Sequence, residues 1–383
     1  GQQAPVAILH DKVKGVRDAN TIGASLVGFN ARSFESYGKD EGQGLNAPVS
    51  EYAAYAYVTA LNHLIRQPNH RQFLGDMTVL YWAENGDEEA ADWLTRALNG
   101  SEEDDDQKLD GYMKAIAHGE PVSATLDLQE SFCVLGLAPN AARLSVRFFY
   151  RSRFSEVVNH VVEHYERIEL THAPFERERL SPYWLLASTV NPNANDKKAS
   201  PPMAGAFLRS ILTGTNYPES LHQAVHTRLR AEHDPTYPRV SLIKAYLLQN
   251  KGLKEEITVA LNPEWTDIPY VLGRLFCMLE SVQQSASPDL NTTIKDRYFT
   301  SACSTPAPVF AQLLKLKEHH LRKLDTPQQI YYQREIGKLL DMLPAATFPK
   351  QLTLPEQDKF ILGYYHQRQA NFTKKTKEEP DHE

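Results

Sequence analysis

Residues 131–167 read SFCVLGLAPNAARLSVRFFYRSRFSEVVNHVVEHYER, and within them the spacing of apolar residues changes from that of strands to that of a helix. The runs 131–137 and 143–150 are short and apolar, and a turn containing Pro and Asn separates them. Ser155 then stands where an N-cap is expected, before valines that recur at helical spacing. Strand, strand and helix in this order predict a small α+β unit.

Polar and apolar residues alternate along the second of these runs. Arg143 and Arg147 are at odd-numbered positions of this run, whereas Leu144, Val146 and Phe148 are at the even-numbered positions between and beside them. Because successive side chains of a strand point to opposite faces, we expect both arginines on one solvent-facing side. There they either bind successive phosphates or form ion pairs with nearby carboxylates.

Upstream of this stretch, the sequence predicts one more strand and one more helix. Residues 77–82, MTVLYW, have the composition of a buried strand, and Ser50 precedes apolar residues spaced as in a helix through Arg66. Residues 84–130 then hold 14 Asp and Glu against three Lys and Arg, with SEEDDDQ at their centre. Blocks of like charge are usually solvated, so we expect an exposed acidic insertion.

Downstream of residue 174, the pattern is helical throughout. Asp234-Pro-Thr-Tyr-Pro is the clearest boundary, and the short loops beyond it favour an antiparallel bundle. We therefore expect an α+β protein, in which a small mixed α/β body is followed by an all-α C-terminal helical bundle. The expected parts are the body (1–173), a helical connecting region (174–237) and the bundle (238–383). Helices are expected at 182–190, 202–213, 218–232, 239–250, 268–284, 292–303, 307–324, 327–342 and 355–372.

The composition, 42% hydrophobic and 10% aromatic, is that of a globular protein. No apolar run is long enough to span a bilayer, so we expect no membrane partner. Three separated cysteines favour a reducing, cytoplasmic compartment over a disulfide scaffold. The net charge is −7, but the acidic insertion alone carries −11, which leaves +4 elsewhere. The remaining surface can therefore be a basic nucleic-acid surface or ordinary solvated surface.

Residues 28–50, GFNARSFESYGKDEGQGLNAPVS, form a long glycine-rich loop, and loops of this length in compact domains are commonly functional. Glycines let the backbone approach a ligand, while amides and cations bind phosphates or base edges. Phe34 and Tyr37 either stack on bases or hold the loop against the core, and for Phe34 we expect the second role. The contact candidates in the loop are Asn30, Arg32, Lys39 and Asn46.

Further basic residues extend the candidate nucleic-acid surface. Lys295 and Arg297 lie near an expected helix start, where free N–H groups also favour phosphate. Individually, each such residue is ordinary solvated charge, and the set matters only where the fold brings its members together. The candidates outside the loop are Lys14, Arg143, Arg147, Lys244, Lys295, Arg297 and Arg368.

The sequence contains no phosphate-binding loop, nucleophile elbow or zinc-protease motif. His222 and His226 lie four residues apart on an expected helix, which is a weak zinc-ligand spacing. Because such pairs are common by chance, we expect no catalytic residue, no metal and no cofactor. A metal-dependent hydrolase built on this helix is the alternative function from another class.

Seven ordered blocks, spread over nearly the whole chain, resemble the large subunit of the type I-C CRISPR surveillance complex (Cascade). They are the loop 28–50, LGLAPNAARLSVRFF (135–149), AGAFLRSILTGTNYP (204–218), IKAYLLQNKG (243–252), PYVLGRLFCMLE (269–280), TIKDRY (293–298) and LGYYHQRQANFTKK (362–375). The resemblance implies a non-catalytic subunit of an RNA-guided complex in antiviral defence. It implies roles in protospacer-adjacent-motif and target DNA binding, in R-loop stabilisation and in recruitment of the helicase–nuclease.

The implied partners are guide RNA, target DNA, the backbone, guide 5′-end and small subunits of Cascade, and the helicase–nuclease. Base pairing with the guide would read the sequence, while protein contacts read the adjacent motif and the backbone. The resemblance also implies that the C-terminal bundle is similar to the small subunit and that an N-terminal domain precedes residue 1. A purely structural scaffold, with interfaces only to protein, is the remaining alternative.

Overall fold

The computed structural model describes residues 4–29, 31–35, 43–99, 127–195, 197–344 and 348–378, with the backbone alone for 374–378. The chain forms two compact units. The first comprises Gly1–Glu163, Ser181–Leu186 and Lys198–Thr215, and the second comprises His164–Leu180, Ala187–Lys197 and Asn216–Glu383. The three-part division expected from the sequence stays a prediction, and the centre of the acidic insertion lies outside the described residues.

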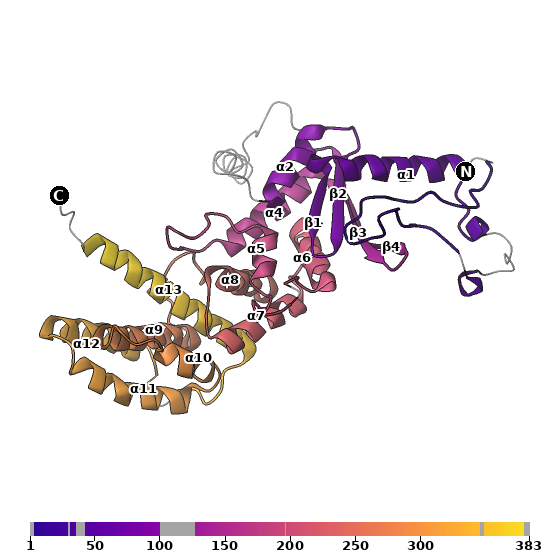
Figure 1. The fold of residues 1–383 in the computed structure, drawn as a ribbon. Coiled ribbons are helices and arrows are strands. Elements are labelled where there is room, and N and C mark those ends of the chain that lie inside the picture. The colour runs from indigo at the N-terminus through magenta and orange to yellow at the C-terminus, as the bar shows by residue number, and fades with distance from the viewer. Residues whose placement is uncertain are drawn as a thin grey trace. The chain divides into compact units, whose positions relative to one another are not determined.

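The first unit is built on a four-stranded antiparallel sheet of order β1-β2-β3-β4 (Figure 1). The strands are β1 (Arg71–Leu74), β2 (Met77–Ala83), β3 (Ser131–Asn140) and β4 (Arg143–Arg153). The expected strand at 77–82 and the expected hairpin are confirmed. The sequence does not predict β1, because its four residues, RQFL, show no alternation that separates them from a loop.

Helix α1 (Glu51–Arg66) packs on one face of this sheet. Ser50 Oγ accepts a hydrogen bond from the Ala53 amide at 3.2 Å, which confirms the expected N-cap and helix. The buried residues that join the helix to the sheet are Val58, Leu61 and Ile65 on α1 and Leu80, Leu137 and Leu144 on the strands. Full burial of each such aliphatic side chain contributes about 1.5–3 kcal/mol, so this cluster fixes α1 against the sheet.

Three helices, α2 (Glu88–Asn99), α4 (Phe154–Ile168) and α6 (Pro201–Thr213), pack against side chains of the opposite face. The Phe154 ring, at the start of α4, lies 4.9 Å from the Phe132 ring and 5.7 Å from the Trp93 ring. A Cβ added at Gly205 of α6 would lie 3.1 Å from the Met77 sulfur, so this helix approaches β2 closely. The sheet is thus covered on both sides, as expected for an α+β unit.

Beyond residue 174, each of the nine expected helices is present, and the residues described there hold no strand. A sheet with helices followed by an all-helical part confirms the α+β class. None of the described helices is both long and apolar enough to cross a membrane. The remaining helices are α5 (Pro182–Ala187), α7 (Glu219–Glu232), α8 (Tyr237–Lys251), α9 (Ile268–Ala286), α10 (Ile294–Ser304), α11 (Pro306–Leu321), α12 (Thr326–Asp341) and α13 (Leu354–Glu378).

Two glycines let α9 and α13 touch backbone to backbone within the second unit. A Cβ at Gly273 would overlap the carbonyl oxygen of Phe360, and a Cβ at Gly363 would overlap that of Tyr270. No other residue type fits at either position without a shift of the opposing backbone. Both glycines lie in sequence blocks on which the family resemblance rests, so the packing of these helices explains part of that pattern.

Candidate nucleic-acid interface

A cleft of about 870 Å³ opens in the second unit, lined by α9, α10, α12 and α13. Lys295 and Arg368, two of the residues expected to bind nucleic acid, both line it. The fold therefore brings together two cations that are far apart in the sequence. The carboxylates Glu280 and Asp296 line it as well. Aromatic rings and side-chain amides also contribute: Tyr331, Tyr332, Tyr364, Phe372, Gln284, Asn291, Gln328 and Asn371.

Arg368 supplies a cation to this cleft from α13. Its guanidinium carbon lies 5.9 Å from the centroid of the Phe372 ring, which is 53% exposed. Among the residues that the structure describes, no carboxylate forms an ion pair with Arg368. An anion that enters the cleft can therefore approach this guanidinium without displacing a protein carboxylate.

Lys295 reaches the same cleft but already has an anionic partner. Its Nζ lies 3.2 Å from Oδ1 of Asp234, and the Asp234 side chain is 44% exposed. The Lys295 side chain is only 19% exposed, so the pair is half-buried, and a phosphate that binds Lys295 must replace this carboxylate.

The start of α10 differs from the sequence expectation. Thr293 Oγ1 accepts a hydrogen bond from the Lys295 amide at 3.2 Å, and Asp296 Oδ2 accepts one from the Thr293 amide at 2.7 Å. This capping box leaves no free N–H at these positions, so the expectation of open phosphate-binding amides there is wrong. Arg297 is exposed, but it is not among the residues that line the cleft.

One wall of the cleft contains a buried carboxylate, Glu280, which is 5% exposed. It accepts hydrogen bonds from the Tyr364 hydroxyl at 2.6 Å and from Thr293 Oγ1 at 2.7 Å. Burial, followed by the charge of Glu280, raises the pKa of Tyr364 well above its usual value. The carboxylate is therefore occupied in joining α9 to α13 and to the start of α10.

Lys244 does not reach the surface, because its side chain is only 2% exposed. Its ammonium donates to the backbone carbonyls of Glu169 at 2.6 Å and Glu166 at 3.2 Å, at the C-terminal end of α4. Carbonyls at a helix end lack partners within the helix and attract cations. Burial lowers the pKa of Lys244 to about 8, against the opposing effect of Glu169 and Glu166. We therefore correct the expected phosphate contact to a buried helix cap.

In the first unit, Arg143 lies over the ring of Phe34, with the guanidinium carbon 4.3 Å from the ring centroid. Phe34 lies in the short helix η1 (Arg32–Phe34) and is 48% exposed, so the expectation that it plugs the core is wrong. The Leu144 amide donates a hydrogen bond to the Ser25 carbonyl at 2.9 Å, which joins the start of β4 to the chain around Ser25. An aromatic–cation pair is therefore presented at one end of the hairpin.

Arg147 does not continue a simple alternation from Arg143. A bulge shifts the register, since Leu137 pairs with Val146 while Gly136 pairs with Phe148. The extra residue in β4 leaves Val146 48% exposed, whereas the sequence predicts an inward position. Arg147 lies 3.3 Å from a carboxylate oxygen of Asp76, which is the ion-pair alternative weighed for this residue.

The other candidates of the first unit lie at its surface or outside the described residues. Lys14 and Arg32 are exposed, whereas Asn46 is half-buried and donates from Nδ2 to the Gln43 carbonyl at 3.4 Å. Asn30 and Lys39 lie outside the part of the chain that the structure describes, so their roles stay predictions.

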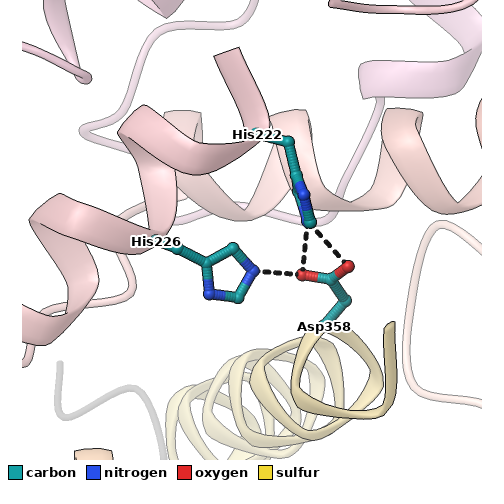
Figure 2. Close-up of side chains that lie close together, drawn as sticks. All are labelled: His222, His226 and Asp358. Carbon is teal, nitrogen blue, oxygen red and sulfur yellow. Dashed lines mark hydrogen bonds and ion pairs between the residues drawn. The ribbon is translucent and has the colours of Figure 1, made fainter. Parts of the chain in front are cut away.

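Three buried side chains of the second unit form a separate cluster, shown in Figure 2. Nε2 of His222 lies 2.8 Å from Oδ2 and 3.0 Å from Oδ1 of Asp358, and Nε2 of His226 lies 2.6 Å from Oδ1. The histidines come from α7 and the aspartate from α13. Imidazole nitrogens and carboxylate oxygens are common metal ligands. From the sequence alone, only the two histidines, four residues apart, are recognisable as neighbours.

A comparison with protein-family models identifies the chain. The model of the family described as CRISPR-associated protein (Cas_Csd1) matches residues 1–372. The chain belongs to this family. No protein in a search of curated sequences matches it.

The Cas_Csd1 family is that of the type I-C large subunit, so the resemblance noted in the sequence is confirmed. Its members are CRISPR-associated components of type I-C Cascade, which acts in antiviral defence, and are generally non-catalytic.

In this Cas_Csd1 chain, sequence reasoning misses the aromatic and amide residues of the cleft. Residues 326–334, TPQQIYYQR, combine amides with two adjacent tyrosines, and this composition is the signal available for Gln328 and Tyr331. Phe372 lies between Arg368 and the pair Lys374-Lys375 near the end of α13, and the sequence does not predict its exposure. Asp358 carries no local signal, because its relation to the two histidines arises only from the packing of α7 and α13.

Proposed function

We propose that this Cas_Csd1 chain contributes to protospacer-adjacent-motif and target DNA binding, stabilises the R-loop and helps to recruit the helicase–nuclease. The observation that supports the proposal most is the cleft of the second unit, where Lys295, Arg368 and several aromatic rings line one cavity. Proteins bind single strands with cationic grooves and with rings on which bases stack, each stacked base contributing about 1–3 kcal/mol. We assign this cleft to a single-stranded segment of the R-loop.

The first unit offers a second group of contacts. Lys14 and Arg32 are exposed, and Arg143 is held over the exposed ring of Phe34. We assign these residues to the phosphate backbone of duplex DNA near the adjacent motif, because cations on an ordered surface position a duplex without reading its bases. Asn30, Lys39, Asn46 and Arg147 remain candidates for the same interface, and Arg297 of the second unit remains a separate candidate for contact with nucleic acid.

The partners we propose are guide RNA, target DNA, the backbone, guide 5′-end and small subunits of Cascade, and the helicase–nuclease, all in the cytoplasm. In this division of labour, the guide RNA reads the target by base pairing, and the protein contacts hold the strands apart. No chemical step is assigned to the chain.

Reconstitution of the type I-C complex with and without this chain tests the proposal. The readout is the affinity for a fluorescent target duplex that carries the adjacent motif, with a duplex that lacks the motif as control. We expect motif-dependent binding to be lost without the chain, while guide RNA remains bound to the other subunits. Equal affinity and equal motif dependence of the two complexes would contradict the proposal.

A further inference from the structure

The carboxylate of Asp358 is enclosed in the second unit without a lysine or arginine partner. Asp358 is 0% exposed, and His222 and His226 are 4% and 2% exposed. A carboxylate removed from water needs a positive charge beside it. Among the described residues, its ion-pair partners are the two imidazoles. The balancing charge therefore comes from a proton on an imidazole or from a bound cation.

The orientation of the two histidines favours the cation. His222 and His226 lie four residues apart on α7, on one face of the helix, and both direct Nε2 at the same carboxylate (Figure 2). Two imidazole nitrogens and one carboxylate oxygen that converge in this way are the ligand types of a zinc site.

The spacing also fits Zn²⁺. Zinc binds histidine nitrogen at about 2.0–2.1 Å and carboxylate oxygen at about 2.0–2.2 Å, and a tetrahedral angle then separates two ligand atoms by about 3.3 Å. The histidine–aspartate distances are 2.6–3.0 Å, and the ligand atoms of all three residues lie within 4.8 Å of one another. Side-chain shifts of less than about 1 Å thus open a site for the ion.

Neighbouring groups fix the His222 ring in this orientation. The Tyr246 ring stacks on it with centroids 3.9 Å apart and an interplanar angle of 2°. The Tyr246 hydroxyl in turn donates to Glu219 Oε1 at 2.6 Å. Outer groups that hold a ligand in place are a regular part of metal sites.

The space beside His222 limits what else can bind. A cavity of about 10 Å³, lined by residues that include Leu221, His222 and Tyr246, holds one water molecule at most. His226 and Asp358 do not line this cavity, so it lies beside the His222 ring and not between the three side chains.

We propose that His222, His226 and Asp358 bind one Zn²⁺ ion that ties α7 to α13. The ion supplies the positive charge that Asp358 requires. This proposal departs from the sequence expectation of no metal, because the third ligand lies 132 residues beyond His226 and only the fold brings it beside the two histidines.

Metal analysis of the full chain, purified without a polyhistidine tag, tests the proposal. We expect stoichiometric zinc in the wild type and its loss in Asp358→Asn, which keeps the shape of the side chain but removes its charge. His226→Gln serves as the second variant. His319→Gln, at an exposed histidine of α11, is the matched control and should retain zinc.

Thermal melting of the wild type provides a readout that needs no variant. A chelator should lower the melting temperature, and added Zn²⁺ should restore it. Protein loaded with Co²⁺ should show the visible absorption of tetrahedral cobalt. A wild-type protein without zinc, whose melting temperature responds neither to chelator nor to added Zn²⁺, would overturn the proposal.

Discussion

Replacing Arg368 with glutamine removes one positive charge from the cleft and retains much of the side-chain length. In our proposal the guanidinium contacts one phosphate of a single strand. It forms no ion pair with a carboxylate of the described residues, although Glu280 and Asp296 also line the cleft. For single strands, the slope of log affinity against log salt is about −0.7 per neutralised phosphate. Loss of one contact thus weakens binding about fourfold at about 0.15 M salt and about eightfold at about 0.05 M, and the slope becomes shallower by about 0.7.

The assay is a titration of the assembled complex with fluorescent target DNA at several salt concentrations. Lys295→Gln should have a smaller effect, because its ammonium already pairs with Asp234 at 3.2 Å and a phosphate contact must replace that pair. Arg322→Gln, at an exposed arginine outside the cleft lining, is the control. An unchanged slope in Arg368→Gln, or an equal loss in Arg322→Gln, would refute the placement of nucleic acid in the cleft.

Gly363→Ala forces a methyl group against the Tyr270 carbonyl, so we expect a loss of about 1–3 kcal/mol or more in urea unfolding. Gly337→Ala, with no atom near the added methyl, should be neutral or stabilising, and equal stabilities of the two variants would contradict this packing. The free energy of unfolding of the wild type, compared with that of Lys244→Met, should increase as the pH rises from about 8 to 10.5. In this range Lys244 has lost its proton in the folded protein but keeps it in the unfolded chain, so rising pH favours the folded state. A stability difference that does not vary over this range argues against the buried ammonium. Phe34→Ala should cost about 0.5–1 kcal/mol through loss of the Arg143 contact, measured as the urea midpoint, and an unchanged midpoint would count against that contact.

Local signals in the sequence were sufficient for the helices and for most strands. Ser50 predicts the start of α1 because an N-cap acts on the amides of the next turn, and the Pro- and Gly-containing connectors separate the later helices for similarly local reasons. The class of the fold follows from the order of these elements. The order of the elements does not show on which side of the sheet Arg147 lies. One bulged residue in β4 interrupts the alternation of side chains between the two faces of the sheet.

The candidate site depends on contacts that are distant in the sequence. Lys244 has the spacing of a surface lysine, but the end of α4 buries it beneath backbone carbonyls. Phe34 lies in an otherwise polar loop, and its partner Arg143 comes from the hairpin. Lys295 and Arg368 share a cleft only because α10 and α13 both line it. Sequence reasoning therefore proposes candidate residues, but it cannot determine which of them lie close together in the fold.

Photo-crosslinking from the cleft tests the central claim most directly. A photoreactive amino acid is placed at Tyr331, which lines the cleft, or at its neighbour Ile330, which is 58% exposed and is not part of the lining. In the complex bound to target DNA, we predict a crosslink between position 331 and the displaced strand, and none from position 330. Equal crosslinking from both positions, or crosslinks from position 331 to protein alone, would contradict the claim that this cleft holds nucleic acid.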